Sequence, residues 1–313
     1  MAKTGETNFE NLALVGGFTL LAIVAGIAYF MSKKKRQQAT DNGHSKLITL
    51  KSPDIKYNFV LAYKESISHD TRLFRFQLPS SSHVLGLPVG QHIYLTTHIN
   101  GDLVKRPYTP TTSDDQQGHF DLVIKVYPQG KMTQYLDKLH INDSIEVNGP
   151  SGNLIYKNNG IFDIRTRKPE PYKSKKIRQL GMIAGGTGIT PMYQILCHIL
   201  KEEENIEQGG KVDLKIWLLF ANQTEQDILL REELELLTST NSDRFRLWYT
   251  VDRPPTSDWK YSTGFVSEQM IREHMPPSSE ETLICCCGPP PMIKAQLTNL
   301  EKLNYTESMR FTF

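Results

Sequence analysis

Two short turns rich in glycine and proline constrain the fold of this chain more than any other feature of its sequence. The first runs from Gly185 to Pro191 (Gly-Gly-Thr-Gly-Ile-Thr-Pro), and the second from Cys287 to Met292 (Cys-Gly-Pro-Pro-Pro-Met). Each turn follows an apolar, strand-like run and precedes a helical pattern. Ligands of open α/β sheets bind at the carboxyl ends of strands, where such turns lie. The two turns therefore predict a sheet of this kind with a ligand site at one edge.

The second half of the chain alternates between strand-like and helical patterns. Apolar runs predict strands at Leu180–Ala184, Leu214–Ala221, Arg244–Val251 and Thr282–Cys287, and helical patterns follow at Pro191–Glu203, Asp227–Leu237, Val266–His274 and Met292–Leu303. Such alternation is typical of a parallel sheet covered by helices. We therefore assign residues 178–313 to a Rossmann-like α/β domain.

The first half has a different rhythm, with short alternating runs broken by proline and glycine. These runs are Tyr57–Leu61, Leu73–Leu78, His92–Leu95 and Phe120–Tyr127. They indicate an antiparallel β-barrel domain over residues 46–156. Residues 157–177 are basic and loop-like, so we expect them to link the two domains. A chain of 313 residues is long enough for both, and the expected fold class is α+β with two domains.

The N-terminal segment carries a candidate membrane span. Leu12 to Met31 are 20 consecutive uncharged residues, and as a helix they would extend roughly 30 Å, enough to cross a bilayer. The basic cluster from Lys33 to Arg36 follows at once, which places the later residues in the cytosol. A signal peptide is the alternative, but its positive charge should precede the apolar run. We expect residues 1–45 to be a transmembrane helix with a polar tether, in the endoplasmic reticulum or outer mitochondrial membrane.

Charge and cysteine content exclude several function classes. The chain has 36 basic and 34 acidic residues, a net charge of +2, which argues against nucleic acid as a partner. Its four cysteines are Cys197 and the run Cys285 to Cys287. This spacing matches neither zinc nor iron–sulfur ligation, so we expect no metal site and reduced thiols.

Both turns have a physical route to nucleotide binding. Glycine removes side chains, so backbone N–H groups can approach a pyrophosphate at the start of a helix. Pro191 suits the first helical turn, and the prolines after Gly288 would form a stiff wall. A purely structural strand-to-helix connection is the alternative in each case, and Cys287 could equally be a small buried apolar residue.

A tetrad upstream of both turns offers complementary groups. Arg106 supplies a guanidinium for phosphate, Tyr108 a ring that can stack on a heterocycle, and Thr109 a hydroxyl. The alternative is an ordinary strand with an exposed tyrosine. The segment from Gly130 to Thr133 opens a helical pattern and could form a second phosphate site.

Three further residues are isolated candidates. Lys125 interrupts an apolar strand, so it faces either water or the pocket. Asp252 follows a strand, where a carboxylate can accept hydrogen bonds from a ribose and would repel a 2′-phosphate, although Arg253 is adjacent. His69 could serve a proton path, or it could be a histidine in a surface turn.

Taken together, these motifs resemble the NADH–cytochrome b5 reductase family of ferredoxin-reductase-like flavoproteins. The resemblance covers residues 52–313 and rests on five segments, 106–110, 121–127, 181–192, 219–225 and 287–292. It implies a flavin-binding antiparallel barrel followed by an NADH-binding α/β domain, with FAD at their interface. Residues 127–130 form a shorter loop than the family usually has, and the C-terminus reads Arg-Phe-Thr-Phe instead of Cys-Phe-Val-Phe.

The resemblance also implies individual roles. Arg106 would hold the FAD pyrophosphate, Tyr108 would lie against the isoalloxazine, and Thr109 would bond near its N5. The cofactor-binding residues implied or inferred in all are Arg106, Pro107, Tyr108, Thr109, Val123, Lys125, Lys131, Met132, Thr133 and Thr190 on the FAD side, and Gly186, Thr187, Gly188, Pro191, Asp252, Cys287, Gly288, Pro289, Pro290 and Met292 on the NADH side.

The chemistry that follows from the resemblance is electron transfer from NADH through FAD to a separate haem protein, cytochrome b5 or a similar one. Thr109 and Lys125 would stabilise the reduced flavin, and His69 is the third catalytic candidate. Basic residues between Arg165 and Arg178 would steer an acidic acceptor, or merely form a solvated linker. We expect a monomer. The alternatives are a reductase using NADPH or a quinone on the same scaffold, and a non-enzymatic nucleotide sensor.

Overall fold

The computed structural model describes residues 46–202, 213–255 and 258–313. The candidate membrane span at Leu12–Met31 and the polar tether lie outside these residues. Within the described ranges, no helix combines the length and the apolar character that crossing a membrane requires.

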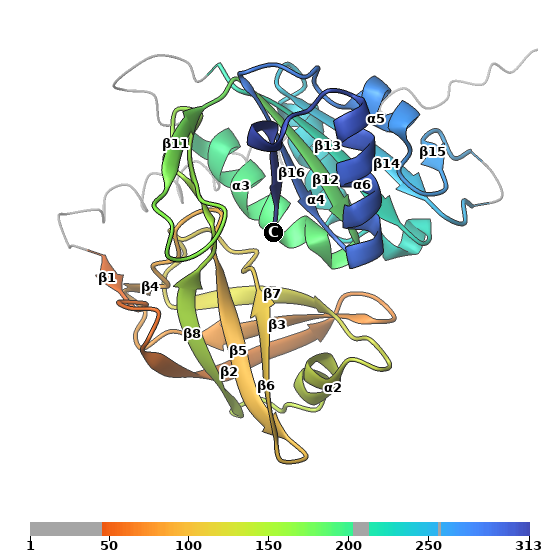
Figure 1. The fold of residues 1–313 in the computed structure, drawn as a ribbon. Coiled ribbons are helices and arrows are strands. Elements are labelled where there is room, and N and C mark those ends of the chain that lie inside the picture. Colours follow the sequence, from red (N-terminus) through yellow and green to blue (C-terminus); the bar gives the residue numbers. More distant parts are fainter. Residues whose placement is uncertain (1–45, 203–212, 256–257) are drawn as a thin grey trace, which may run out of the picture. The chain divides into compact units, whose positions relative to one another are not determined.

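The first domain is built on a six-stranded antiparallel sheet (Figure 1). Its strands, in spatial order, are β6 (Asp102–Tyr108), β5 (His92–Ile99), β8 (Ser144–Ser151), β2 (Lys56–Ser66), β3 (Thr71–Gln77) and β7 (His119–Lys125). The described residues give no pairing between the two outer strands, β6 and β7. The sheet is therefore an open antiparallel half-barrel, where we predicted an antiparallel β-barrel.

One face of this sheet forms the core of the domain. Phe74, Phe76 and Leu122 are among its fully buried side chains. On β3, Phe74 and Phe76 alternate with the more exposed Arg75 and Gln77, as a half-buried sheet requires. The short helix α2 (Lys131–Asp137) adds Met132 and Leu136 to the same core. Strands β1 (Leu47–Ile48) and β4 (His83–Val84) form a separate two-stranded parallel pair.

The segment between the domains is not the loop that we expected. Strands β9 (Leu154–Tyr156), β10 (Ile161–Ile164) and β11 (Lys173–Lys176) form a three-stranded antiparallel sheet. Strand β11 reads Lys-Ser-Lys-Lys and pairs through its main chain along the whole of β10, so no apolar alternation reveals it. Phe162 on β10 is fully buried and joins the core of the second domain.

The second domain confirms the predicted parallel sheet. Its spatial order is β15 (Ser262–Thr263), β14 (Phe245–Val251), β13 (Lys215–Asn222), β12 (Gln179–Gly185), β16 (Thr282–Cys287) and β17 (Arg310–Thr312). The helices between strands are α3 (Ile189–Glu202), α4 (Arg231–Thr240), α5 (Glu268–His274) and α6 (Pro290–Lys302). All four predicted helices are present, with shifted boundaries.

Alternate residues of the central strands belong to two different cores. Met182 packs in the cluster that contains α3 and α4, whereas its neighbour Ile183 packs in the cluster that contains α5 and α6. Both faces of the sheet are thus covered, which explains why its strands read as continuous apolar runs.

The order of the strands reverses between β12 and β16. The chain leaves β12 toward β13 and β14 on one side, then returns to β16 on the other. Such a reversal opens a crevice at the carboxyl ends of the two strands. Both glycine-rich turns begin at this point (Figure 1).

Candidate functional site

A cavity of about 1260 Å³ lies between the half-barrel and the carboxyl edge of the parallel sheet. Pockets for a single ligand typically measure about 300–1,000 Å³, so this volume suits more than one small ligand. It brings together most of the residues predicted from the sequence: Arg106, Pro107, Tyr108, Thr109, Val123, Lys125, Lys131, Met132, Thr133, Gly186, Thr187, Gly188, Thr190, Pro191, Asp252, Cys287, Gly288, Pro289 and Met292.

The two glycine-rich turns pack directly against each other. Ala184 pairs with Cys287 at the ends of β12 and β16. A side chain on Gly188 would collide with the Cys287–Gly288 backbone, and one on Gly185 would collide with Met292. Gly186 has a left-handed φ of 53° and open space around it, a conformation that glycine adopts without strain. The glycines therefore serve turn-to-turn packing and also leave bare backbone facing the cavity.

The tetrad lies at the end of β6, the edge strand of the half-barrel sheet, with Thr109 directly after the strand. An edge strand tolerates Pro107, because the missing N–H would have pointed away from a partner. Arg106 is exposed, and its Nη1 donates to the Lys105 carbonyl at 2.8 Å; among the described residues it forms no ion pair. Burial raises the pKa of Tyr108, so its hydroxyl stays protonated. Thr109 is buried. This geometry leaves a guanidinium, a ring and a hydroxyl along one wall.

The segment before α2 uses its polar groups internally. Thr133 Oγ1 donates to the Gly130 carbonyl at 3.1 Å and accepts from the Tyr127 N–H at 3.1 Å. Lys131 Nζ lies 3.1 Å from Asp102 Oδ2, with both side chains exposed. The Thr133 hydroxyl that we assigned to a cofactor therefore already fixes the turn.

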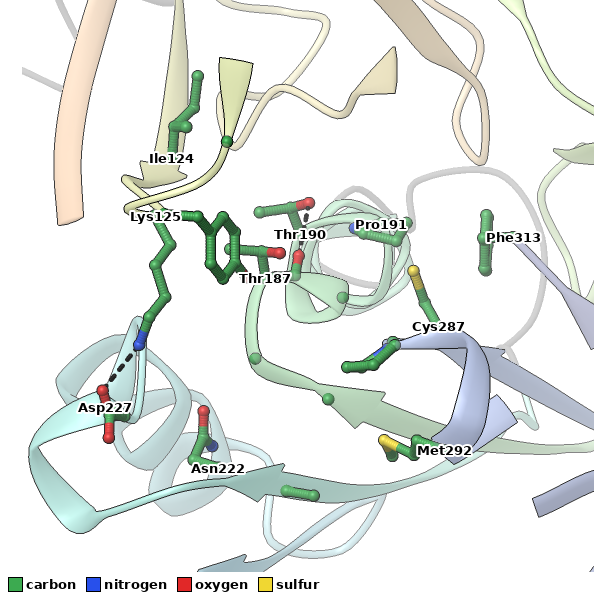
Figure 2. A pocket seen from close by; sticks show the side chains of 18 of the residues that line it. Ile124, Lys125, Thr187, Thr190, Pro191, Asn222, Asp227, Cys287, Met292 and Phe313 are labelled. Carbon is green, nitrogen blue, oxygen red and sulfur yellow. Dashed lines mark hydrogen bonds and ion pairs between the residues drawn. The ribbon is translucent and has the colours of Figure 1, made fainter. Parts of the chain in front are cut away.

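Lys125 extends from the end of β7 to Asp227, at the edge of the cavity. Its Nζ lies 2.7 Å from Asp227 Oδ1 and 2.8 Å from Asp70 Oδ2, and Figure 2 shows the side chain extended toward Asp227. Burial alone would lower the pKa of Lys125, but its hydrogen bonds to Asp227 and Asp70 raise it. The ammonium is therefore held by two carboxylates, an arrangement that the sequence did not predict.

Two predicted residues do not line the cavity. His69 is 66% exposed, and its Nε2 lies 3.4 Å from Asp70 Oδ2 in the turn between β2 and β3. His69 therefore corresponds to the surface-turn alternative, because it lies in the exposed turn that connects the paired strands β2 and β3. Pro290, the first residue of α6, does not line the cavity either. Its neighbour Pro291 does.

Several of the basic residues expected to steer an acceptor have structural partners instead. Lys175 Nζ donates to the carbonyls of Thr282 and Ser308 at 3.0 and 2.9 Å. Arg178 lies 3.2 Å from Glu281, and Arg165 stacks on Tyr172. Lys168, Lys173 and Lys176 form no ion pair within the described ranges, and they are the remaining candidates for steering.

The cavity also has buried polar atoms that lack a partner within the described residues. These are Nε2 of His92, both side-chain polar atoms of Asn222, and Oε1 of Gln296. Such an atom costs about 1–3 kcal/mol and calls for an explanation; a bound ligand would supply one. Burial, and then the charge of Lys168, lower the pKa of His92 to about 4, so its ring is neutral at physiological pH.

Our sequence reasoning assigned no role to these three residues. Asn222 ends β13, and the rule about strand ends that found the glycine turns would have found it too. Gln296 lies in the middle of α6 and His92 begins β5, so neither position carries a comparable signal.

The C-terminal residue Phe313 and the thiol of Cys287 also line the cavity. The Phe313 N–H donates to the Cys286 carbonyl at 3.1 Å, and Figure 2 shows Phe313 on the side of the cavity opposite Lys125. Burial raises the pKa of Cys287 to about 11, so it is a neutral thiol. The structure describes all four cysteines as free.

Comparison with known proteins matches both domains. The model of an oxidoreductase FAD-binding domain matches residues 58–156, and that of an oxidoreductase NAD-binding domain matches residues 182–297. Human NADH-cytochrome b5 reductase 1 is 49% identical over 309 residues, covering 96% of this chain and 95% of the relative. NADH-cytochrome b5 reductase 3 of Rattus norvegicus is 54% identical over 86% of this chain and 90% of its own. Among solved structures, the cytochrome b5 reductase domain of Ulva prolifera nitrate reductase superposes with a TM-score of 0.76 at 38% identity, covering 86% of this chain and 100% of that domain.

Proposed function

The chain belongs to the NADH–cytochrome b5 reductase family, and we propose that it passes electrons from NADH through FAD to cytochrome b5. The observation that carries this proposal is a single large cavity with two chemically different walls. One wall presents Arg106, Tyr108 and Thr109, and the other presents the bare backbone of the two glycine-rich turns. The relatives bear the name of this activity.

The residues of the half-barrel fit FAD. Arg106 has donors available for a pyrophosphate, and the flat ring of Tyr108 suits an isoalloxazine. Buried Thr109 offers a hydroxyl at the same wall, and Thr190 reaches the cavity from the first turn of α3. Bound FAD would supply acceptance of a hydride and release of single electrons.

The sheet wall fits NADH. Gly186, Thr187 and Gly188 leave main chain accessible at the start of α3, where the helix dipole favours a phosphate. Asp252 lines the cavity at the end of β14, and there it would accept hydrogen bonds from a ribose and repel a 2′-phosphate. Arg253 does not line the cavity, and its Nη2 lies 3.4 Å from Gln223 Oε1. This arrangement favours NADH over NADPH.

The contribution of the chain to catalysis is chiefly orientation. Holding two reacting rings in contact can lower a barrier by about 7–11 kcal/mol. The two walls face each other across one cavity, so each can fix one ring. The neutral thiol of Cys287 and the neutral imidazole of His92 add no competing charge.

The partner and the location are further parts of the proposal. Lys168, Lys173 and Lys176 would steer an acidic acceptor toward the domain boundary. The apolar run Leu12–Met31 would anchor the enzyme with its catalytic domain in the cytosol, and an anchor confines the search for a membrane-bound acceptor to two dimensions.

Stopped-flow mixing tests this proposal. The purified protein should be yellow, NADH should bleach its visible flavin absorbance far faster than NADPH, and oxidised cytochrome b5 should then restore the absorbance. A colourless protein would favour a nucleotide sensor. Efficient use of NADPH, or reoxidation by a quinone but not by cytochrome b5, would favour another reductase on this scaffold.

A further inference from the structure

Lys125, Asp70 and Asp227 form an ion cluster that joins the two domains. Lys125 and Asp70 belong to the region that matches the FAD-binding model, whereas Asp227 belongs to the region that matches the NAD-binding model. The Lys125–Asp227 pair spans 102 positions of sequence at 2.7 Å. The cluster is therefore a contact between domains, and it lies at the edge of the cavity (Figure 2).

The three groups are held firmly in the charged form. The side chains of Lys125, Asp227 and Asp70 are 17%, 9% and 23% exposed. Burial would raise the pKa of each carboxyl, but the hydrogen bonds from Lys125 lower both. The carboxylates stay ionised as long as the pH is above their lowered pKa values, and Lys125 stays charged until the pH exceeds its raised one, so the cluster persists throughout the neutral range.

Asp227 is anchored on its own domain by its second oxygen. Its Oδ2 accepts from Thr224 N at 3.0 Å and from Thr224 Oγ1 at 2.6 Å, which closes the short helix η3 (Glu225–Asp227). This turn follows Asn222 and Gln223, and both line the cavity. A displacement of Asp227 would therefore shift Asn222 and Gln223, which form the part of the NADH wall at the end of β13.

A second tie between the domains is made by α3. Gln194 Oε1 accepts from the Gly90 N–H at 2.8 Å, and its Nε2 donates to the Gln91 carbonyl at 3.4 Å. This tie consists of neutral groups. Lys201 Nζ and Asp115 Oδ2 form another ionic contact between the domains at 2.7 Å, but both side chains are 50% exposed, and exposed ion pairs contribute little. The Lys125 cluster is therefore the more buried ionic tie, and a single change of charge can open it.

We propose that Lys125 is a positioning residue, which acts through Asp227 to fix the spacing between the flavin wall and the NADH wall. This inference rests on the proposed function and differs from a direct role for the Lys125 charge on the flavin. Because a displacement of about 1 Å can slow a positioned reaction by about 100-fold, a loosened cluster should slow hydride transfer more than it weakens binding of either cofactor.

The variant Asp227→Asn opens this tie selectively. Asparagine keeps one carbonyl oxygen for Thr224, and it turns an N–H₂ group toward Lys125. We expect hydride transfer from NADH, measured by stopped flow, to fall about 10- to 100-fold, while flavin content is unchanged and the NADH dissociation constant changes less than about threefold. Lys125→Gln should give the same result without further loss in the double variant, and Lys125→Arg should restore part of the rate.

Asp70→Asn is the matched control, because it removes a carboxylate from the same lysine within one domain. It should slow hydride transfer less than about threefold, since it leaves the Asp227 contact intact. Hydrogen–deuterium exchange of the holoenzyme gives a second readout. Asp227→Asn and Lys125→Gln should raise exchange in residues 223–228 and at the end of β7, and Asp70→Asn should not raise it in residues 223–228.

Two results would overturn the inference. One is a shift of the flavin midpoint potential in Lys125→Gln with hydride transfer unaffected in Asp227→Asn, which would mean that the lysine acts on the flavin directly. The other is unchanged exchange in residues 223–228. If the wild-type protein neither binds FAD nor is reduced by NADH, the proposed function fails, but the same exchange comparison on the protein as purified, without FAD, still tests the tie.

Discussion

The two walls of the cavity differ in how far their polar groups are already satisfied. On the half-barrel wall, the Thr133 hydroxyl and the Lys125 ammonium have protein partners at hydrogen-bond distance. On the sheet wall, glycine backbone is bare and both polar atoms of Asn222 are buried without a partner. Apart from the exposed Arg106 guanidinium and the His92 ring, the first wall is thus built by its own contacts, whereas the second has unmet hydrogen-bonding capacity. This difference suits a resident cofactor on one side and an exchanging one on the other.

Of the substitutions predicted here, Gly188→Ala in the sheet wall should cause the largest loss of stability. The new Cβ would meet the Cys287–Gly288 backbone, which cannot move aside as a side chain could. We expect a loss of about 3 kcal/mol in the free energy of unfolding, together with loss of NADH binding. Gly186→Ala is the control, because its Cβ would enter open space; it should cost about 1 kcal/mol, for its left-handed φ alone. Equal losses in urea denaturation would contradict this account.

His92 is the exception on the half-barrel side, and the pH dependence of stability should reveal it. Folded His92 has a pKa of about 4 and unfolded His92 about 6.5, so the unfolded chain binds more protons between these values. Stability should therefore fall as the pH drops from 6.5 to 4, by about 2 kcal/mol from this residue.

His92→Phe keeps a ring beside Tyr94 and removes the titration. The variant should lose about 2 kcal/mol less than the wild type between pH 6.5 and 4, as measured by chemical denaturation at a series of pH values. Parallel profiles for wild type and His92→Phe would mean that His92 titrates normally.

Asn222→Leu and Thr133→Val should change stability in opposite directions, by smaller amounts. Leucine branches at Cγ as asparagine does and removes two unpaired polar atoms, so the NADH-free protein should gain about 1 kcal/mol. NADH should bind about tenfold more weakly to it, a loss of about 1.4 kcal/mol. Thr133→Val removes two made hydrogen bonds and should cost about 1–2 kcal/mol. Isothermal titration measures the affinity for NADH, and thermal unfolding measures the stability of each variant. Destabilisation by Asn222→Leu would contradict the proposed difference between the two walls.

The parallel sheet could be predicted from the sequence because its signals are local. Strand β16 has the predicted bounds Thr282–Cys287, since an apolar run ends abruptly at glycine and proline. Helix α6 begins at Pro290, two residues before the predicted start, because proline is tolerated in a first helical turn. The predicted helix from Asp227 begins at Arg231, after Leu230 adopts a left-handed φ of 56°, a break that no residue type in the segment signals.

The contacts between the walls could not be predicted in the same way. Lys125 was recognised as a charge in an apolar strand, but its partners Asp70 and Asp227 are distant in sequence and meet it only in the folded chain. Strand β11 was missed because pairing through the main chain leaves no pattern in Lys-Ser-Lys-Lys. Gln296 faces the cavity from within an ordinary helix. These are tertiary features, and the sequence carries no local signal for them.

The central claim is that both walls serve one reaction, with NADH and FAD in direct contact between them. Stopped-flow reduction with NADH deuterated at the reactive C4 position tests this most directly. We predict that bleaching of the visible flavin absorbance is slower with the deuterated cofactor than with ordinary NADH. Purified protein without a flavin spectrum, or with no bleaching by NADH at all, would contradict the account.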